Sequence, residues 1–213
     1  MVIRKFGILN TNVPNDVMFY GIPFPGDYLI NPDGVVREKL FLPDYQERAA
    51  ASQVVLKDFG SAIDDNGVTV TADDVEAKIS LSGSHNFSGN EIGVMVDFTV
   101  GPGWHIYGRP LPEGYTPTAV KFDDALVSEQ SIVFPKPTPV KFELLGETLP
   151  VYQGNFKAIG TLRLKQKLPP GDHTLGGTLE FQECNDSLCK MPRTAHFEIP
   201  IKIEALTPGT PKS

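Results

Sequence analysis

The chain has 213 residues, of which 40% are apolar and 21% are charged, and its formal net charge is −7. This apolar fraction is too high for a disordered chain, and the acidic balance argues against a nucleic-acid-binding surface, which needs basic residues to displace counterions. Apolar runs of only a few residues predict no transmembrane segment, and two cysteines cannot build a disulfide-dense scaffold.

The first 57 residues are rich in aromatic side chains and contain a hairpin signal. Residues 28–30 form a β-prone run, 31–34 (NPDG) are turn residues, and 35–41 continue as a second strand. The segment 44–59 is typical of a helix, with Asp44 as the N-cap and Glu47 three residues later. A hairpin and one helix are too little for an independent core, so we expect this region to pack on something else.

The beginning of the chain and the polar stretch 58–67 bear on its organisation. Residues 1–13 contain two basic residues but neither a long apolar stretch nor a small-residue cleavage site, so the sequence predicts no signal peptide. The stretch 58–67, with two Gly and three Asp, is typical of a linker. Residues 1–60 carry 6 basic and 7 acidic side chains, and the remainder carries 13 and 19, so the acidity belongs to the second region.

Beyond this linker the apolar pattern has a period of two. One face of a strand is predicted to be buried through Ile92, Val94, Val96, Phe98 and Val100. Further strands are expected at 68–70, 77–81, 105–107, 119–122, 132–134, 156–168, 173–183 and 195–203, with turn signals at 101–103, 135–139 and 169–172. So many short strands with no long helix between them predict a mainly β protein with an antiparallel sandwich.

Cys184 and Cys189 are the only cysteines, and they bracket the turn-forming residues 185–187 closely enough to form a bridge. Three interpretations compete: a redox-active pair, a structural staple, and two reduced thiols that are inert or bind metal. Closing so short a loop contributes only about 2 kcal/mol. Zinc needs four ligands, and neither His173 nor His196 has a characteristic spacing, so we expect no metal site. Spacing alone leaves the redox pair and the staple equally open.

The flanking residues carry a resemblance. The segment 66–206 resembles the N-terminal periplasmic domain of the DsbD thiol:disulfide interchange family through three motifs in order. GWHIYGRP (103–110) resembles that family's aromatic strand near the active site, LLGETLPVYQGNF (144–156) its cap-loop region, and FQECNDSLCKMP (181–192) its active-site hairpin. The resemblance implies an immunoglobulin-like fold, which agrees with the strand count, and thiol–disulfide exchange without a cofactor.

The resemblance also implies a direction and a place. Electrons would come from a thioredoxin-like protein and pass to protein disulfide partners, in the periplasm or another extracytoplasmic compartment. Cys184 and Cys189 would be the catalytic pair, with Cys189 joined to the partner in the mixed disulfide and Cys184 resolving it. An apolar cap loop would shield the pair from nonspecific oxidation. Its candidate residues are Leu144, Leu145, Gly146 and Tyr152, the last of which either closes the cap or packs under it.

Other side chains are candidates for the neighbourhood of the cysteines. His105 or Tyr107 would lie beside them, where His105 lowers a thiol pKa or relays a proton. The alternative places Trp104 or Tyr107 in the core and His105 at the sheet edge. Glu183 and Asp186 would raise a thiol pKa if close, and the alternative makes both solvated turn residues.

A second resemblance concerns residues 19–50, which are similar to the C-terminal half of peroxiredoxin-like (AhpC/TSA) thioredoxin folds. It implies a strand–hairpin–helix unit with Pro25 where such folds often hold a cis proline. The initial βαβ unit and its cysteine are missing, so this part would perform no redox chemistry. We expect a small α/β, partial thioredoxin-like fragment at 1–60, a sandwich at 61–207 and a flexible tail at 208–213. The rival to exchange is a noncatalytic protein-binding sandwich with a structural disulfide.

Overall fold

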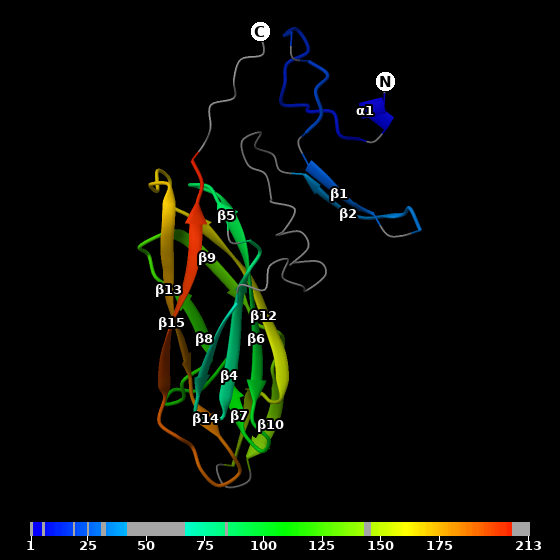
Figure 1. Ribbon diagram of the computed structural model, residues 1–213. Coiled ribbons are helices and arrows are strands. Elements are labelled where there is room, and N and C mark those ends of the chain that lie inside the picture. Colours follow the sequence, from blue (N-terminus) through cyan, green and yellow to red (C-terminus); the bar gives the residue numbers. More distant parts are fainter. Residues whose placement is uncertain are drawn as a thin grey trace. The chain divides into compact units, whose positions relative to one another are not determined.

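The computed structural model describes residues 2–5, 7–18, 20–24, 26–30, 33–41, 67–83, 85–142 and 146–205 (Figure 1). The chain divides into two compact units, Met1–Ala49 and Ala50–Ser213. Over these residues the structure has no helix with the length and apolarity needed to cross a membrane.

The first unit contains the predicted hairpin. Strands β1 (Gly26–Ile30) and β2 (Val36–Phe41) pair antiparallel, and Gly34 takes a φ of +77° in the turn between them, a conformation that favours glycine. A short helix, α1 (Val2–Lys5), precedes them and was not predicted. The helix expected over 44–59 and the proline at position 25 lie outside the described residues, so the resemblance to a thioredoxin half stays a prediction.

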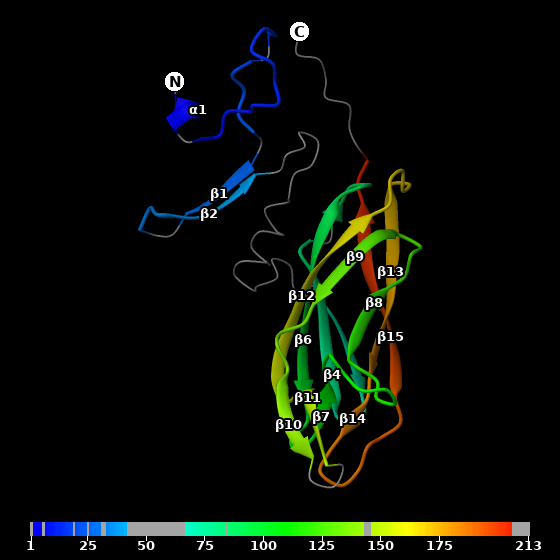
Figure 2. The same ribbon diagram turned by 180° about the vertical axis from the view of Figure 1, so that it is seen from behind.

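The second unit is a β-sandwich, as predicted (Figures 1 and 2). One sheet has the order β3-β4-β6-β12-β9, with bounds Val68–Ala72, Val75–Leu81, Glu91–Val100, Asn155–Leu164 and Val127–Val133. The other has the order β5-β15-β13-β8, with bounds His85–Asn86, Arg193–Ile203, Gly171–Phe181 and Ala119–Phe122. Neighbouring strands run antiparallel except β5, which pairs parallel with β15.

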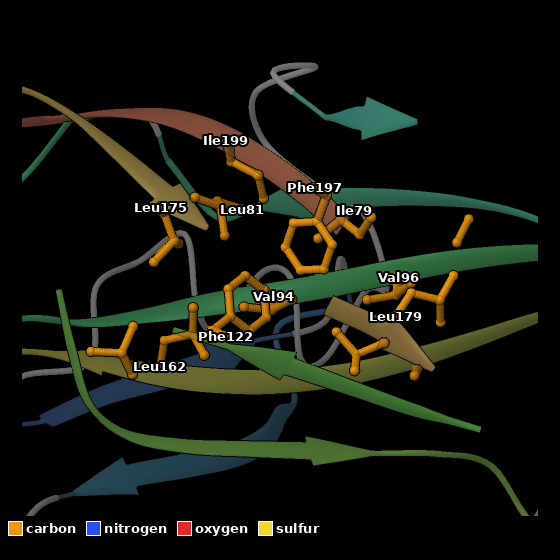
Figure 3. Close-up of a cluster of buried hydrophobic side chains, with 14 of the residues drawn as sticks. Ile79, Leu81, Val94, Val96, Phe122, Leu162, Leu175, Leu179, Phe197 and Ile199 are labelled. Atoms are coloured by element: carbon orange, nitrogen blue, oxygen red, sulfur yellow. The ribbon is translucent and has the colours of Figure 1, made fainter. Parts of the chain in front are cut away.

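The two sheets enclose a continuous apolar core (Figure 3). The buried face predicted for β6 is confirmed, because all five of its predicted core positions are at most 3% exposed. The opposite face is not uniformly exposed, since Gly93 and Met95 are also buried in this central strand. Each fully buried side chain of this size contributes roughly 1.5–3 kcal/mol. The core residues that Figure 3 labels are Ile79, Leu81, Val94, Val96, Phe122, Leu162, Leu175, Leu179, Phe197 and Ile199.

A glycine makes room for an aromatic pair in this core. Gly177 of β13 lies opposite Phe122 of β8 on one side and Phe197 of β15 on the other. The two rings meet edge to face with centroids 5.2 Å apart. A Cβ at Gly177 would lie 2.7 Å from the Lys121 carbonyl oxygen and would also collide with the Phe197 ring. Only glycine therefore fits at position 177 without displacing the Lys121 carbonyl or the Phe197 ring.

A third, smaller sheet forms one end of the second unit, where Figures 1 and 2 show its strands gathered together. Its order is β10-β11-β7-β14, with bounds Thr138–Phe142, Glu147–Tyr152, His105–Tyr107 and Glu183–Cys184. The sequence did not predict β10 and β11, because residues 135–139 carry a turn signal and residues 144–156 resemble a cap-loop region. Pro139 of β10 and Pro150 of β11 lie opposite each other in the register, so neither has to donate an N–H to the other. On its other side, the Pro150 carbonyl accepts a hydrogen bond from the Gly108 N–H.

Candidate functional site

The cysteines lie at the tip of the longest hairpin of the second unit. Strands β13 and β15 pair from Gly171 with Ile203 to Phe181 with Arg193, and the segment between them forms the cysteine hairpin. Within it Cys184 and Cys189 are joined in a disulfide. The Asn185 N–H donates to the Leu188 carbonyl at 2.9 Å, and the Asn185 side-chain oxygen accepts from two N–H groups of the turn. An asparagine that satisfies its own turn in this way explains the tight reversal.

The two sulfurs differ in access. Cys184 is 1% exposed and packs with Tyr107, Phe142, Leu149 and Val151, whereas Cys189 is exposed. Thiol–disulfide exchange requires an open approach to the sulfur under attack. The geometry therefore favours attack at Cys189, with Cys184 as the leaving group.

The Tyr107 hydroxyl contacts the buried sulfur. It donates to Cys184 Sγ at 2.9 Å and lies 3.5 Å from Cys189 Sγ. Burial raises the pKa of Tyr107 to about 12, so this phenol keeps its proton at neutral pH and can act only as a neutral donor. Its ring meets Tyr115 edge to face at 5.1 Å, and the Tyr115 hydroxyl donates to Glu147.

His105 lies opposite Cys184 in the register of β7 and β14. It is 2% exposed, its ring centroid is 4.6 Å from that of Phe142, and burial lowers its pKa. A neutral imidazole does not supply the positive charge that would stabilise a thiolate. Of the two alternatives for His105, the place beside the cysteines is the one found, and the place at a sheet edge is wrong, because β7 lies between β11 and β14.

Glu183 is buried rather than solvated, contrary to the alternative that makes it a turn residue. Its side chain is 0% exposed and forms an ion pair with Lys190. The Lys190 ammonium is also 2.8 Å from Asp74 Oδ2 and 4.1 Å above the centroid of the Trp104 ring. Lys190 was not among the site residues predicted from the sequence. The sequence did contain a signal for this pair: Glu183 precedes Cys184 and Lys190 follows Cys189. In a hairpin whose two cysteines are bridged, the residues just outside them lie opposite each other.

The remaining near-site residues fall in different places. Asp186 is exposed in the turn. Trp104 is half-buried and packs against the main core, as the alternative interpretation placed it. Trp104 and Asp186, together with His105 and Phe142, line a cavity of about 340 Å³ beside the cysteine hairpin.

The cap candidates are only partly described. Leu144 and Leu145 lie outside the described residues. Gly146 belongs to the turn between β10 and β11, where it takes a φ of +67° and its N–H donates to the Phe142 carbonyl. Tyr152 belongs to the main core: its ring stacks on Phe156 at 4.5 Å and its hydroxyl donates to the Pro135 carbonyl.

Among the described residues no group of three or more His, Cys, Asp or Glu side chains is placed to hold a metal ion. The disulfide has one exposed and one buried sulfur, and the Tyr107 phenol lies beside the buried one.

The Cys184–Cys189 disulfide thus lies at the tip of an antiparallel β-sandwich. A family model described as "Thiol:disulfide interchange protein DsbD, N-terminal" matches residues 76–200, which is more than half of the chain. The chain belongs to this family, and the resemblance found in the sequence is confirmed for this region.

Two solved structures are similar to parts of this chain. The N-terminal periplasmic domain of ScsB from Proteus mirabilis is 16% identical with a TM-score of 0.48, over 67% of this chain and 52% of that one. The chain thus spans about half the length of that structure. The Neisseria meningitidis DsbD N-terminal domain, in its reduced form, is 22% identical with a TM-score of 0.34, over 52% of this chain and 78% of that one. No curated protein matches the chain.

Proposed function

We propose that the second unit is a thiol–disulfide exchange module that passes electrons from a thioredoxin-like donor to protein disulfide partners through Cys184 and Cys189. The observation that carries the proposal is the unequal access to the two sulfurs, one buried at 1% exposure and one exposed. A permanent staple has no need of this asymmetry. An exchange site needs it, because the partner's sulfur must reach one cysteine and the electron pair must leave on the other.

The forward reaction takes two steps. A thiolate of the donor attacks Cys189 Sγ, the bond between Cys189 and Cys184 breaks, and its electron pair moves to Cys184. The donor's second thiolate then attacks the mixed disulfide and releases Cys189. Two electrons and two protons have moved, the donor dithiol has become a disulfide, and this chain holds two thiols. Passing electrons onward reverses these steps against a protein disulfide.

Tyr107 assists the first step in this mechanism. Its hydroxyl is already 2.9 Å from the sulfur that becomes a thiolate. Hydrogen bonds to charged acceptors are about twice as strong as those to neutral ones, so the bond strengthens as the negative charge develops on Cys184. Tyr107 is thus a catalytic residue. His105, which lies opposite the same cysteine, has a packing role, because its ring lies against that of Phe142.

We place this chemistry in an oxidising compartment such as the periplasm, where disulfides form and persist. The partner surface is the tip of the hairpin, where Leu188 and Met191 on either side of Cys189 are 56% and 81% exposed. The cavity lined by Trp104 and His105 offers room for partner residues that flank the attacking cysteine.

Trapping a mixed disulfide tests the proposal. The acceptor is a thioredoxin whose resolving cysteine is changed to Ala and whose remaining cysteine carries thionitrobenzoate. In Cys184→Ala, the Cys189 thiolate should attack that cysteine, release coloured thionitrobenzoate and leave a covalent complex. The matched variant Cys189→Ala should react far more slowly, because Cys184 is buried.

A redox titration separates exchange from the rival staple. We expect a reduction potential above about −300 mV, since structural disulfides of secreted proteins lie below that value. A lower potential, together with no covalent complex from Cys184→Ala, would leave a noncatalytic binding module as the function.

A further inference from the structure

The residues just outside the two cysteines join across the hairpin. Glu183 precedes Cys184, Lys190 follows Cys189, and the Lys190 ammonium forms an ion pair with the Glu183 carboxylate. The Lys190 N–H also donates to the Glu183 carbonyl at 2.9 Å. A backbone bond and a side-chain pair therefore close the hairpin directly beside the disulfide, without involving sulfur.

The pair is anchored to the sandwich. The Lys190 ammonium contacts Asp74 and the face of Trp104 as described above, and the Asp74 N–H donates to Glu183 Oε2 at 3.3 Å. Asp74 lies in the turn between β3 and β4. Both strands of the cysteine hairpin are thus tied to one fixed point of the five-stranded sheet.

Burial makes the pair persistent. The Glu183 side chain is 0% exposed and that of Lys190 is 26% exposed. A buried carboxylate is strongly unfavourable without a cation or donors, so Glu183 retains Lys190 whether or not the sulfurs are bonded. The tie across the hairpin therefore outlasts the disulfide when the site is reduced.

We propose that the Glu183–Lys190 pair is a positioning device that holds the two thiols of the reduced protein within bonding reach and so shifts the equilibrium toward the disulfide. The inference rests on the proposed function and deepens it by assigning the residues that set the redox poise of the site. The ion pair and the disulfide both close the same hairpin, so each makes the other more favourable by the same factor.

The equilibrium concerned is a balanced two-electron exchange. A reductant dithiol and the Cys184–Cys189 disulfide become a reductant disulfide and two cysteine thiols, and two protons pass from the reductant to the cysteines. The reductant contributes equally in every variant. Differences between variants therefore report how closely this chain holds its own thiols together.

The experiment equilibrates the full chain with graded mixtures of reduced and oxidised dithiothreitol. The reduced fraction is measured by thiol alkylation and by the fluorescence of Trp104, the single tryptophan, on whose ring Lys190 lies. Glu183→Gln keeps the shape and an acceptor for the Asp74 N–H but removes the charge. We expect its equilibrium constant for disulfide formation to be at least about fivefold smaller, where a tenfold change corresponds to about 30 mV.

Two further variants test the pair as a unit. Lys190→Met keeps an unbranched apolar stem over Trp104, and the double variant Glu183→Gln/Lys190→Met restores a neutral, matched site. If the residues act together, the double variant shifts the constant no further than Glu183→Gln alone. In reduced protein, the Lys190 N–H should exchange with deuterium faster in Glu183→Gln than in wild type.

Glu91→Gln is the matched control. It breaks the ion pair between Glu91 and Arg163, which lies at the start of β6, whereas Trp104 follows the end of that strand. If folded Glu183→Gln has the same constant as Glu91→Gln within twofold, the pair has no positioning role and the proposal is overturned. A shifted constant without any trapped thioredoxin complex would instead support positioning and reject exchange, so the two failures are distinguishable.

Discussion

Tyr107 shows how one buried residue gives direction to a symmetric bond. A disulfide can be cleaved at either sulfur, but only Cys184 has a phenol donor at 2.9 Å, and only Cys189 is exposed. The donor stabilises charge on the sulfur that an incoming thiolate cannot reach. Access and stabilisation therefore select the same leaving group.

Removing this hydroxyl should slow the reaction without emptying the core. In Tyr107→Phe we expect reduction by dithiothreitol to be about 3- to 10-fold slower, because the Cys184 thiolate loses a charge-assisted hydrogen bond and leaves less readily. Stopped-flow Trp104 fluorescence gives the rate. Tyr115→Phe is the control, since that hydroxyl donates to Glu147. Equal rates for Tyr107→Phe and wild type would contradict the role.

His105 predicts a pH dependence of stability. Burial lowers its pKa in the folded chain below the unfolded value of about 6.5. Between the two pKa values the unfolded chain binds more protons, so the free energy of unfolding should fall as the pH decreases below about 6.5. Urea unfolding at several pH values between 5 and 7.5 measures this slope. His105→Phe should reduce this slope, and an equal slope in His105→Phe and wild type would contradict the prediction.

At the scale of the elements, the sequence predicted those strands best in which apolar residues mark a buried face. The expected ranges 105–107 and 119–122 agree with β7 and β8, and the period of two identified β6. The range 132–134 caught only the end of β9, because that strand is exposed over most of its length and carries little alternation. Local pattern therefore finds buried strands best.

For the site, too, a local pattern in the sequence predicts only part of the structure. Spacing indicated that the two cysteines could form a bridge, and a place for Tyr107 beside them was one of two alternatives; the disulfide and the hydrogen bond of Tyr107 agree with both. The burial of Glu183 and its bond to Lys190 depend on a contact with Asp74, 109 residues earlier in the chain. Such long-range contacts leave no local pattern in a single sequence.

The close packing around Gly177, where β13 pairs with β8 and β15, gives a prediction. Gly177→Ala should lower the free energy of unfolding by about 1–3 kcal/mol, because the new methyl group overpacks the space between the Lys121 carbonyl and the Phe197 ring. Chemical denaturation measures the change. Gly83→Ala is the control, since no atom lies within 4 Å of a Cβ there, and it should differ from wild type by no more than about 0.5 kcal/mol. An equal effect of both substitutions would contradict the packing argument.

At the scale of the whole molecule, stability and redox chemistry are carried by different parts. The main core lies between the two large sheets, and the disulfide closes a loop with a sequence separation of only 5 residues. Closing so short a loop contributes about 2 kcal/mol in the chain-entropy model. The sandwich should therefore stay folded in both redox states, as a domain that cycles between them requires.

Reduction should accordingly lower the free energy of unfolding by no more than about 2 kcal/mol and leave the far-ultraviolet circular dichroism unchanged. Unfolding in urea with and without dithiothreitol provides the comparison, and the Cys184→Ala/Cys189→Ala double variant supplies a permanently reduced reference. Loss of cooperative unfolding on reduction would show that the disulfide supports the fold.

The position of the cysteines at the tip of the β13–β15 hairpin has a consequence for how such a domain diverges. The ladder from Gly171–Ile203 to Phe181–Arg193 holds the strands in register, while the tip beyond it carries the two cysteines. At the exposed tip residues Leu188 and Met191, substitutions should alter partner choice with little loss of stability, because neither side chain is buried. The exposed part of the tip can therefore change its partners by a few substitutions, whereas close packing constrains the residues of the sandwich beneath it.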